Sequence, residues 1–451
     1  KGQGLSQAYL DFFLVSFERH LKLYGSQTIF LSARSMENAV SEFQINGVPN
    51  GVRIWDVTDP YNALDQEFTV ENNMARFATP TDQLKTFVVF DNDIQAPAII
   101  GKIQPQNLRG IASPDLVIVT HPEFHSEALR LAAHRESFSN FTAVVVTTLE
   151  VYNEFSSGRQ DVTAIRDFMR HIYGNDPPSH KALLLFGKGS YDFKDRVPNN
   201  TNFVITYESR NSLHPLQTYS SDDYFGFLED HEGEWTEGAS PVNHSMDIGV
   251  GRLPVKTVQE AQNIVDKIID YDLNKAAFGY WRKQMVFVAD DGNGEDGFHT
   301  IHQFQADQLA TFAESSAVGI DAEKLFMGSY PKTVKPNGET VPAMTDDIVR
   351  AFDQGALVIN YTGHGSEDQW ADENVFNTNT INRLDNKIYP FLVTATCEFG
   401  RNDDPLRISG AEYAVNAAYA GAIGILTSAR DLSAITNFNF NYAFYEALFE
   451  R

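Results

Sequence analysis

The only cysteine of the chain, Cys397, stands at the end of an apolar run that reads FLVTAT. His364 lies between two glycines directly after a second apolar run, ALVINYT, and Asp290 and Asp291 follow a third, QMVFVA. A thiol, an imidazole and a carboxylate are the groups that a cysteine hydrolase uses as nucleophile, general base and orienting acid. The types and positions of these residues therefore predict nucleophilic catalysis.

The chemistry explains why these types belong together. An imidazole beside a thiol stabilises the thiolate, which is the attacking species, and it can later protonate a leaving amine. A carboxylate on the other ring nitrogen would fix the tautomer of His364, and either Asp290 or Asp291 could supply it. The backbone N–H groups of Gly365 and Cys397 are candidates for an oxyanion hole, where one donor is worth about 3 kcal/mol at the transition state.

Each of these residues also has a plain structural explanation. A lone cysteine after an apolar run is often a small buried side chain, and a histidine or a pair of aspartates beside glycine is often part of a turn. Functional groups collect beyond the carboxyl ends of the strands in open α/β sheets. The matching placement of all three residue types at predicted strand ends favours the catalytic interpretation.

The elements that must position these residues fall into three regions. Residues 1–108 contain short aromatic-rich runs, among them AYLDFFLVSFERHL, separated by turn residues, which predicts a small, mostly-β domain. From residue 109 onward, short apolar runs alternate with helical patterns, which is typical of doubly wound, mainly parallel α/β sheets covered on both faces. We divide this part into two α/β subdomains, 109–275 and 276–451, and expect the second to carry the cysteine and the histidine.

Composition excludes several classes of protein. The chain has 451 residues and a net charge of −25, which disfavours binding to nucleic-acid phosphates or to an anionic membrane through a basic patch. One cysteine excludes an intrachain disulfide and a cysteine-rich zinc site, and no apolar run is long enough for a transmembrane helix. Because the chain starts at Lys1 without a signal-peptide pattern, we expect a piece of a longer protein. The acidic loops 220–226 and 290–296 could hold calcium, but such loops are more often solvated turns, so no metal or other cofactor is expected.

The segments NYTGHGSEDQW (360–370) and FLVTATCEFG (391–400) resemble the catalytic segments of the gingipain-type cysteine peptidases. Further blocks, among them FGKGSYDFKDR, YSSDDYFG and IGVGRLPV, occur in the order of the family, and the resemblance covers residues 112–451. It implies a gingipain- or caspase-like fold in which His364 and Cys397 form the catalytic dyad.

The resemblance also assigns further site residues. It implies that Asp291 orients the histidine, with Asp290 as the alternative. Arginine-specific gingipains carry an acidic residue in the primary specificity pocket, and Phe298 or His299 takes its place in this sequence. The resemblance therefore implies no preference for Arg or Lys.

Within the family, TCEFGRNDDP, SGAEYAVNA and GAIGILTSARDL resemble the subgroup that acts as sortase of the type IX secretion system of Bacteroidetes. This implies a transpeptidase that removes the C-terminal sorting domain of cargo proteins through a thioester on Cys397 and anchors them to lipopolysaccharide. It also implies the extracellular face of the outer membrane, with the barrel PorV as partner and PorQ and PorZ in the same complex. Two alternatives stay open: a secreted gingipain-like endopeptidase, and a catalytically dead scaffold of the same fold.

Overall fold

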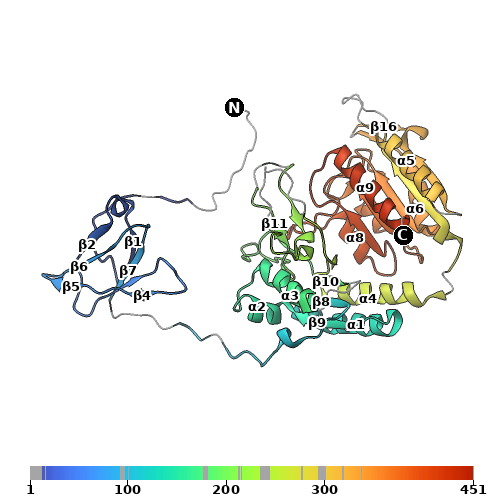
Figure 1. The fold of residues 1–451 in the computed structure, drawn as a ribbon. Coiled ribbons are helices and arrows are strands. Elements are labelled where there is room, and N and C mark those ends of the chain that lie inside the picture. The colour runs from blue at the N-terminus through green and yellow to red at the C-terminus, as the bar shows by residue number, and fades with distance from the viewer. Residues whose placement is uncertain are drawn as a thin grey trace. The chain divides into compact units, whose positions relative to one another are not determined.

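The computed structural model divides the chain into two compact units, Lys1–Gln104 and Pro105–Arg451, and each is described here by itself (Figure 1). The structure describes residues 13–15, 17–91, 97–99, 101–175, 181–211, 214, 216–233, 244–275, 278–292, 301–316, 319–336 and 338–449. Among these residues, we find no helix with the length and apolar character that crossing a membrane requires.

The first unit is a small β domain with two antiparallel sheets, ordered β1-β7-β3-β4 and β2-β6-β5. Its strands are β1 Gln27–Leu31, β2 Val40–Asn46, β3 Arg53–Asp56, β4 Leu64–Asp65, β5 Thr69–Glu71, β6 Met74–Pro80 and β7 Thr86–Phe90. Alternate residues point to opposite faces of a strand, so Phe43 of β2 and Phe77 of β6 meet on the inner face with ring centroids 5.1 Å apart. The predicted mostly-β domain is confirmed.

The first sheet of the second unit is parallel and ordered β13-β10-β8-β9. Its strands are β8 Leu116–Thr120, β9 Ala143–Thr147, β10 Ala182–Phe186 and β13 Gly249–Leu253, and its helices are α1 His125–Ser139, α2 Thr148–Phe155, α3 Val162–Asn175 and α4 Val258–Leu273. Val117 of β8 packs in one core with α2 and α3, whereas Ile118 packs in another with α1 and α4. Because both faces are covered, β8 is buried throughout and reads as a continuous apolar run.

The second sheet is also parallel and ordered β15-β14-β18-β21-β22. Its strands are β14 Gln284–Ala289, β15 Asp321–Phe326, β18 Val358–Thr362, β21 Phe391–Ala395 and β22 Gly424–Thr427, and its main helices are α5 Ile301–Ser316, α6 Pro342–Gln354, α8 Gly410–Asn416 and α9 Ala434–Phe449. Helices α5 and α9 cover one face and α6 and α8 the other. The predicted doubly wound architecture is confirmed.

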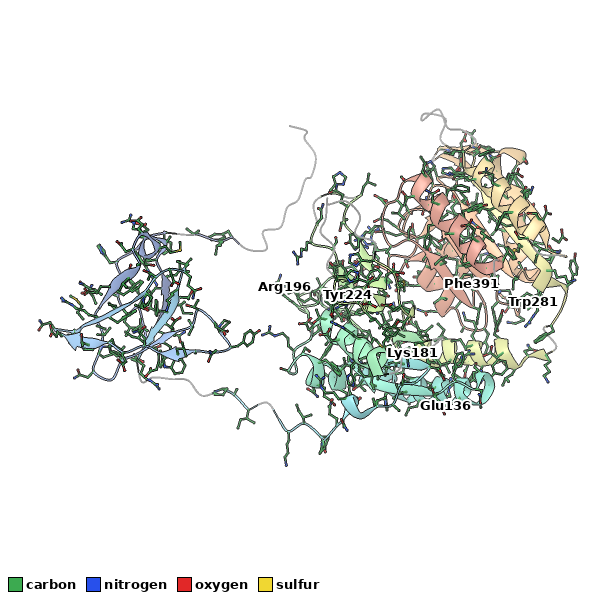
Figure 2. The ribbon with its side chains drawn as sticks, viewed as in Figure 1. Glu136, Lys181, Arg196, Tyr224, Trp281 and Phe391 are labelled. Carbon is green, nitrogen blue, oxygen red and sulfur yellow. The ribbon has the colours of Figure 1, made fainter. Side chains whose placement is uncertain are left out.

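Short elements complete the second unit. They include, among the described residues, the helix α7 Thr378–Ile381 and the two-stranded ribbons β11 Tyr207–Glu208 with β12 Ser220–Ser221, β16 Thr333–Lys335 with β17 Gly338–Thr340, and β19 Gln369–Trp370 with β20 Phe376–Asn377. Side chains fill the space between sheets and helices, with Tyr224 beside the first sheet and Phe391 within the second (Figure 2).

Two buried lysines join the two sheets of this unit. Lys188, which follows β10, forms an ion pair with Glu412 of α8 at 2.7 Å, and both side chains are almost fully buried. Lys267 of α4 donates to three carbonyl oxygens at and after the end of α8, those of Val415, Ala417 and Ala420. Each ammonium therefore satisfies acceptors of the other sheet's layer, which fixes α8 against the first sheet.

Candidate active site

The candidate nucleophile and base lie at adjacent strand ends. β18 and β21 are parallel neighbours, and Thr362 pairs with Ala395. His364 and Cys397 each stand two residues beyond this pair, and the backbone N–H of Gly363 continues the ladder to the Ala395 carbonyl at 3.3 Å. The carboxyl ends of parallel strands open at one edge of the sheet, so the structure brings the two residues to the same edge.

The loops that carry these residues are in direct contact. A Cβ atom at Gly365 would collide with the hydroxyl of Thr396, which precedes the cysteine, and with the carbonyl oxygen of Gln369. A Cβ atom at Gly363 would collide with the side chain of Asp290. Both glycines are therefore required because the backbone around the histidine passes in contact with its neighbours.

The two predicted oxyanion donors are available. Within the part of the chain that the structure describes, the backbone N–H groups of Gly365 and Cys397 form no hydrogen bond with the protein. Donors that are held in place and unused can bind the charge that develops on a carbonyl oxygen at the transition state.

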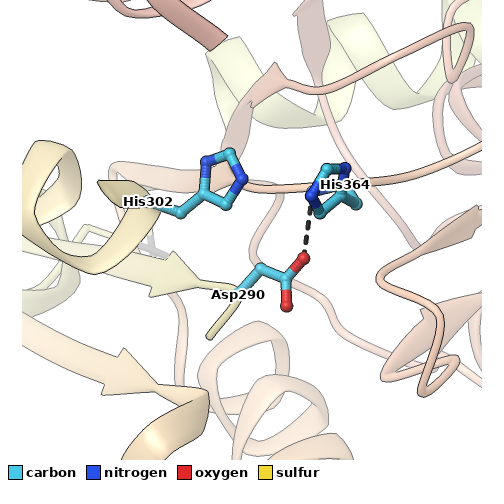
Figure 3. Close-up of side chains that lie close together, drawn as sticks. All are labelled: Asp290, His302 and His364. Atoms are coloured by element: carbon cyan, nitrogen blue, oxygen red, sulfur yellow. Dashed lines mark hydrogen bonds between the residues drawn. The ribbon is translucent and has the colours of Figure 1, made fainter. Parts of the chain in front are cut away.

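The main chain of His364 is fixed by three hydrogen bonds. Its N–H donates to the carboxylate of Asp290 at 3.1 Å, drawn as the dashed line in Figure 3. Its carbonyl accepts from the hydroxyl of Tyr361 at 2.5 Å and from the N–H of Ala371 at 2.9 Å. Tyr361 is itself fully buried and stacks on Trp370 with ring centroids 4.6 Å apart. These contacts hold the main chain of His364 in place.

The carboxylate hydrogen-bonded to the main chain of His364 belongs to Asp290, the alternative in the sequence-based assignment, and the orienting role of Asp291 stays a prediction. Asp290 is 1% exposed; burial raises its pKa, while the N–H groups of His364 and Gly292 oppose the shift. Asp291 instead forms an ion pair with Lys332 at 3.1 Å. The carboxylates of Asp290 and Asp291 offer oxygen atoms within 4.8 Å of each other, but in the described residues Asp291 is engaged by Lys332.

His302 is a neighbour of the site that no sequence motif marked. It lies in the first turn of α5, is buried, and packs its ring edge-on against that of His364 with centroids 5.0 Å apart (Figure 3). Asp290, His302 and His364 offer ligand atoms that lie within 4.8 Å of one another. Two imidazoles and a carboxylate are donors of the type that zinc takes.

The loops predicted as possible calcium sites and the predicted specificity residues lie only partly within the described residues. In the loop 220–226, the carboxylate of Asp222 is engaged by Arg252 at 2.6 Å. In the loop 290–296, residues 293–296 lie outside the described residues, and so do the predicted specificity residues Phe298 and His299.

The thiol of Cys397 is half-buried and donates to the carbonyl oxygen of Leu432 at 3.7 Å. Burial, and then the negative charges of Asp431 and Glu398, raise the pKa of this thiol. The Nε2 atom of His364 is buried and has no hydrogen-bond partner among the described residues. In this conformation the thiol is therefore not hydrogen-bonded to the imidazole.

A cavity of about 220 Å³ lies between β21, β22 and the N-terminal half of α9, and its lining includes Ala395, two residues before Cys397, and Leu432, whose carbonyl accepts from the thiol. It is lined by Val393, Thr394, Ala395, Leu426, Thr427, Ser428, Leu432, Thr436, Asn437, Phe440 and Asn441. None of these lining residues is charged, and most of the wall is apolar. An uncharged cavity next to a nucleophile can hold one side chain of a substrate.

Residues 111–451 match the family model of Peptidase family C25. The chain belongs to this family. It is 25% identical to gingipain R2 of Porphyromonas gingivalis over 228 residues, which cover 50% of this chain and 27% of that protein. The chain thus spans about a quarter of the length of this curated C25 relative, and the predicted membership in the gingipain-type family is confirmed.

A solved structure agrees with the C25 fold. The crystal structure of the Arg-specific cysteine proteinase gingipain R matches with a TM-score of 0.57 and 17% identity over 75% of this chain and 68% of that chain, which confirms the predicted gingipain fold. The chain is also similar to the crystal structure of dimeric latent PorU from Porphyromonas gingivalis, with 29% identity and a TM-score of 0.49 over 56% of this chain and 25% of that chain.

Proposed function

We propose that this chain is the catalytic part of a cysteine peptidase that acts as a transpeptidase, the sortase of a type IX secretion system. The proposal depends on one observation, the side-by-side exit of His364 and Cys397 from the paired strands β18 and β21. Membership in Peptidase family C25 supports peptide-bond chemistry. The motifs at residues 396–405, 409–417 and 421–432 support the sortase role within that family.

The proposed reaction begins when the Cys397 thiol leaves the Leu432 carbonyl and passes its proton to His364. The thiolate attacks the scissile carbonyl of the cargo protein, and the N–H groups of Gly365 and Cys397 hold the oxyanion. The intermediate collapses to a thioester as the amine of the sorting domain leaves with a proton from His364. An amine of lipopolysaccharide then attacks the thioester, His364 accepts its proton, and a new amide forms as the thiolate is released.

The same resemblance supports a location and partners. The proposed transpeptidase works on the extracellular face of the outer membrane, with the barrel PorV as its attachment and PorQ and PorZ in the complex. Its substrates are cargo proteins with a C-terminal sorting domain.

The test uses a reporter protein with a C-terminal sorting domain, the purified chain, and lipopolysaccharide as amine donor, with mass spectrometry of the products. The proposal expects release of the sorting domain and a reporter joined to the amine, with both products absent for Cys397→Ala and strongly reduced for His364→Ala.

Each alternative gives a different result. Cleavage of reporters that lack a sorting domain, with water as the only acceptor, would establish the secreted endopeptidase. No cleavage together with a Cys397 that stays inert to iodoacetamide in the folded protein would establish the inactive scaffold.

A further inference from the structure

The cavity beside Cys397 is placed to receive one particular substrate side chain. Ala395, in its wall, precedes the nucleophile by two residues on the same segment, and Leu432, also in the wall, accepts the hydrogen bond of the thiol. In a bound substrate, the carbonyl carbon that the sulfur attacks is bonded to the Cα atom of the same substrate residue. The side chain on that Cα atom, which we call the acyl side chain, therefore starts two bonds from the attacked carbon, one bond closer than the side chain of the leaving residue, and we take it as the occupant of the cavity.

The cavity excludes a charged acyl side chain. None of its lining residues is acidic or basic, and the carboxylates that act on the thiol, Asp431 and Glu398, are not among them. A guanidinium or ammonium group that enters without a partner loses its hydration, at a cost of several kcal/mol. Arg and Lys are therefore disfavoured, unlike in gingipain R, whose structure is described as that of an Arg-specific proteinase.

Among the polar residues of the wall, Asn441 combines complete burial with unused hydrogen-bonding capacity. Asn441 of α9 lines the cavity with no exposed surface, and neither its Oδ1 nor its Nδ2 atom has a partner among the described residues. The hydroxyls of Thr394 and Thr427 are different, because they bond to each other at 2.6 Å. A buried amide without partners destabilises the protein, and a matching group of a ligand can offset this loss.

An amide in the substrate is the group that matches both ends of Asn441, because it offers a donor and an acceptor together. We infer that the cavity beside Cys397 binds an uncharged, amide-bearing acyl side chain, that of Gln or Asn, with Asn441 as the residue that selects it. This inference rests on the proposed peptidase function and names the substrate class of the same site.

The test compares three peptides that differ only in the acyl residue, which is Gln, Leu or Arg. The wild-type chain is expected to cleave the Gln peptide with a kcat/KM on the order of tenfold above that of the Leu peptide, the effect of one well-made hydrogen bond. The Arg peptide is expected to be cleaved least. Asn441→Leu keeps the volume and removes the amide, so the ratio of Gln to Leu should fall to about one.

A matched control is Asn416→Leu, since Asn416 of α8 also has an unpaired Oδ1 atom but does not line the cavity. It should leave the Gln to Leu ratio unchanged, and the ratio corrects for any general loss of activity. Preference for the Arg peptide, or an unchanged ratio in Asn441→Leu, would overturn the inference.

Binding separates this inference from the proposed function. The Cys397→Ala chain cannot form a thioester, so the affinities of the three peptides, measured by fluorescence anisotropy, report the cavity alone. Tighter binding of the Gln peptide, lost in the double variant with Asn441→Leu, supports the inference even if the wild-type chain cleaves nothing. Equal binding of all three peptides contradicts the inference whatever the outcome of the cleavage experiments.

Discussion

The carboxylate of Asp290 accepts the backbone N–H of His364, at 3.1 Å, rather than a ring nitrogen. Together with the bonds of Tyr361 and Ala371 to the His364 carbonyl, it determines where the histidine main chain crosses the edge of the sheet. Asp290 therefore positions the imidazole through the backbone. The adjacent aspartate faces Lys332 and provides an internal comparison.

Asp290→Ala should lower kcat/KM by roughly ten- to a hundredfold, because one hydrogen bond to a charged acceptor is worth about 1.5–3 kcal/mol and the loop would shift without it. Asp291→Ala removes a partly exposed ion pair and should change kcat/KM by less than about twofold. The measurement is peptide cleavage over a range of pH, together with thermal unfolding of both variants. Equal losses in the two variants would contradict the positioning role of Asp290.

Gly365→Ala should abolish most of the activity while the fold survives. The added methyl group would collide with Thr396 and with the backbone of Gln369, so the loop carrying the base must move away from the loop carrying the nucleophile. Gly249→Ala is the control, because its Cβ would meet only the carbonyl oxygen of Lys181 at an ordinary 3.9 Å. Wild-type kcat/KM in Gly365→Ala would show that the two loops are not held together as the structure has them.

The sequence was sufficient to predict that His364 and Cys397 stand just beyond strand ends, for a physical reason. A parallel strand covered on both faces must be apolar throughout, so β18 and β21 stand out as runs, and the first polar residues after them mark the open edge of the sheet. His364 and Cys397 each stand two residues after the end of their strand, and Thr396, between β21 and the cysteine, is buried. The two residues lie at the same edge of the sheet because β18 and β21 are hydrogen-bonded neighbours.

Other features depend on tertiary contacts that one sequence does not reveal. Which of Asp290 and Asp291 faces the histidine depends on how the chain leaves β14, and His302 reaches the site only through the packing of α5. The aromatic run at residues 8–21, by contrast, suggests β structure in the sequence that the fold does not contain there. Its described part forms no strand and leaves Phe13 and Phe17 exposed, because alternation alone does not supply a partner strand.

Asp431→Asn should make the thiol easier to ionise. Burial and the charges of Asp431 and Glu398 raise the pKa of Cys397, so alkylation by iodoacetamide, which needs the thiolate, should rise only above the pH usual for a free cysteine. Removing one negative charge should shift the midpoint of the rate profile down by roughly half a pH unit. Asp368→Asn, at an exposed site, should leave the midpoint in place. A midpoint that is the same in all three proteins would remove Asp431 from the environment of the thiol.

Lys188→Met should destabilise the second unit by about 3–5 kcal/mol, because it leaves the buried Glu412 without its cation. Burial raises the pKa of Glu412, and loss of the lysine raises it further, so the folded variant retains a proton that the unfolded chain releases. The stability of the variant should therefore fall as the pH rises from about 5 to about 8, measured by urea unfolding. The double variant with Glu412→Gln should recover much of the loss and its pH dependence. Lys387→Met is the control, because it breaks an exposed pair with Asp385 and should cost less than about 1 kcal/mol at either pH. If Lys188→Met costs no more than this control, the buried pair does not hold α8 against the first sheet.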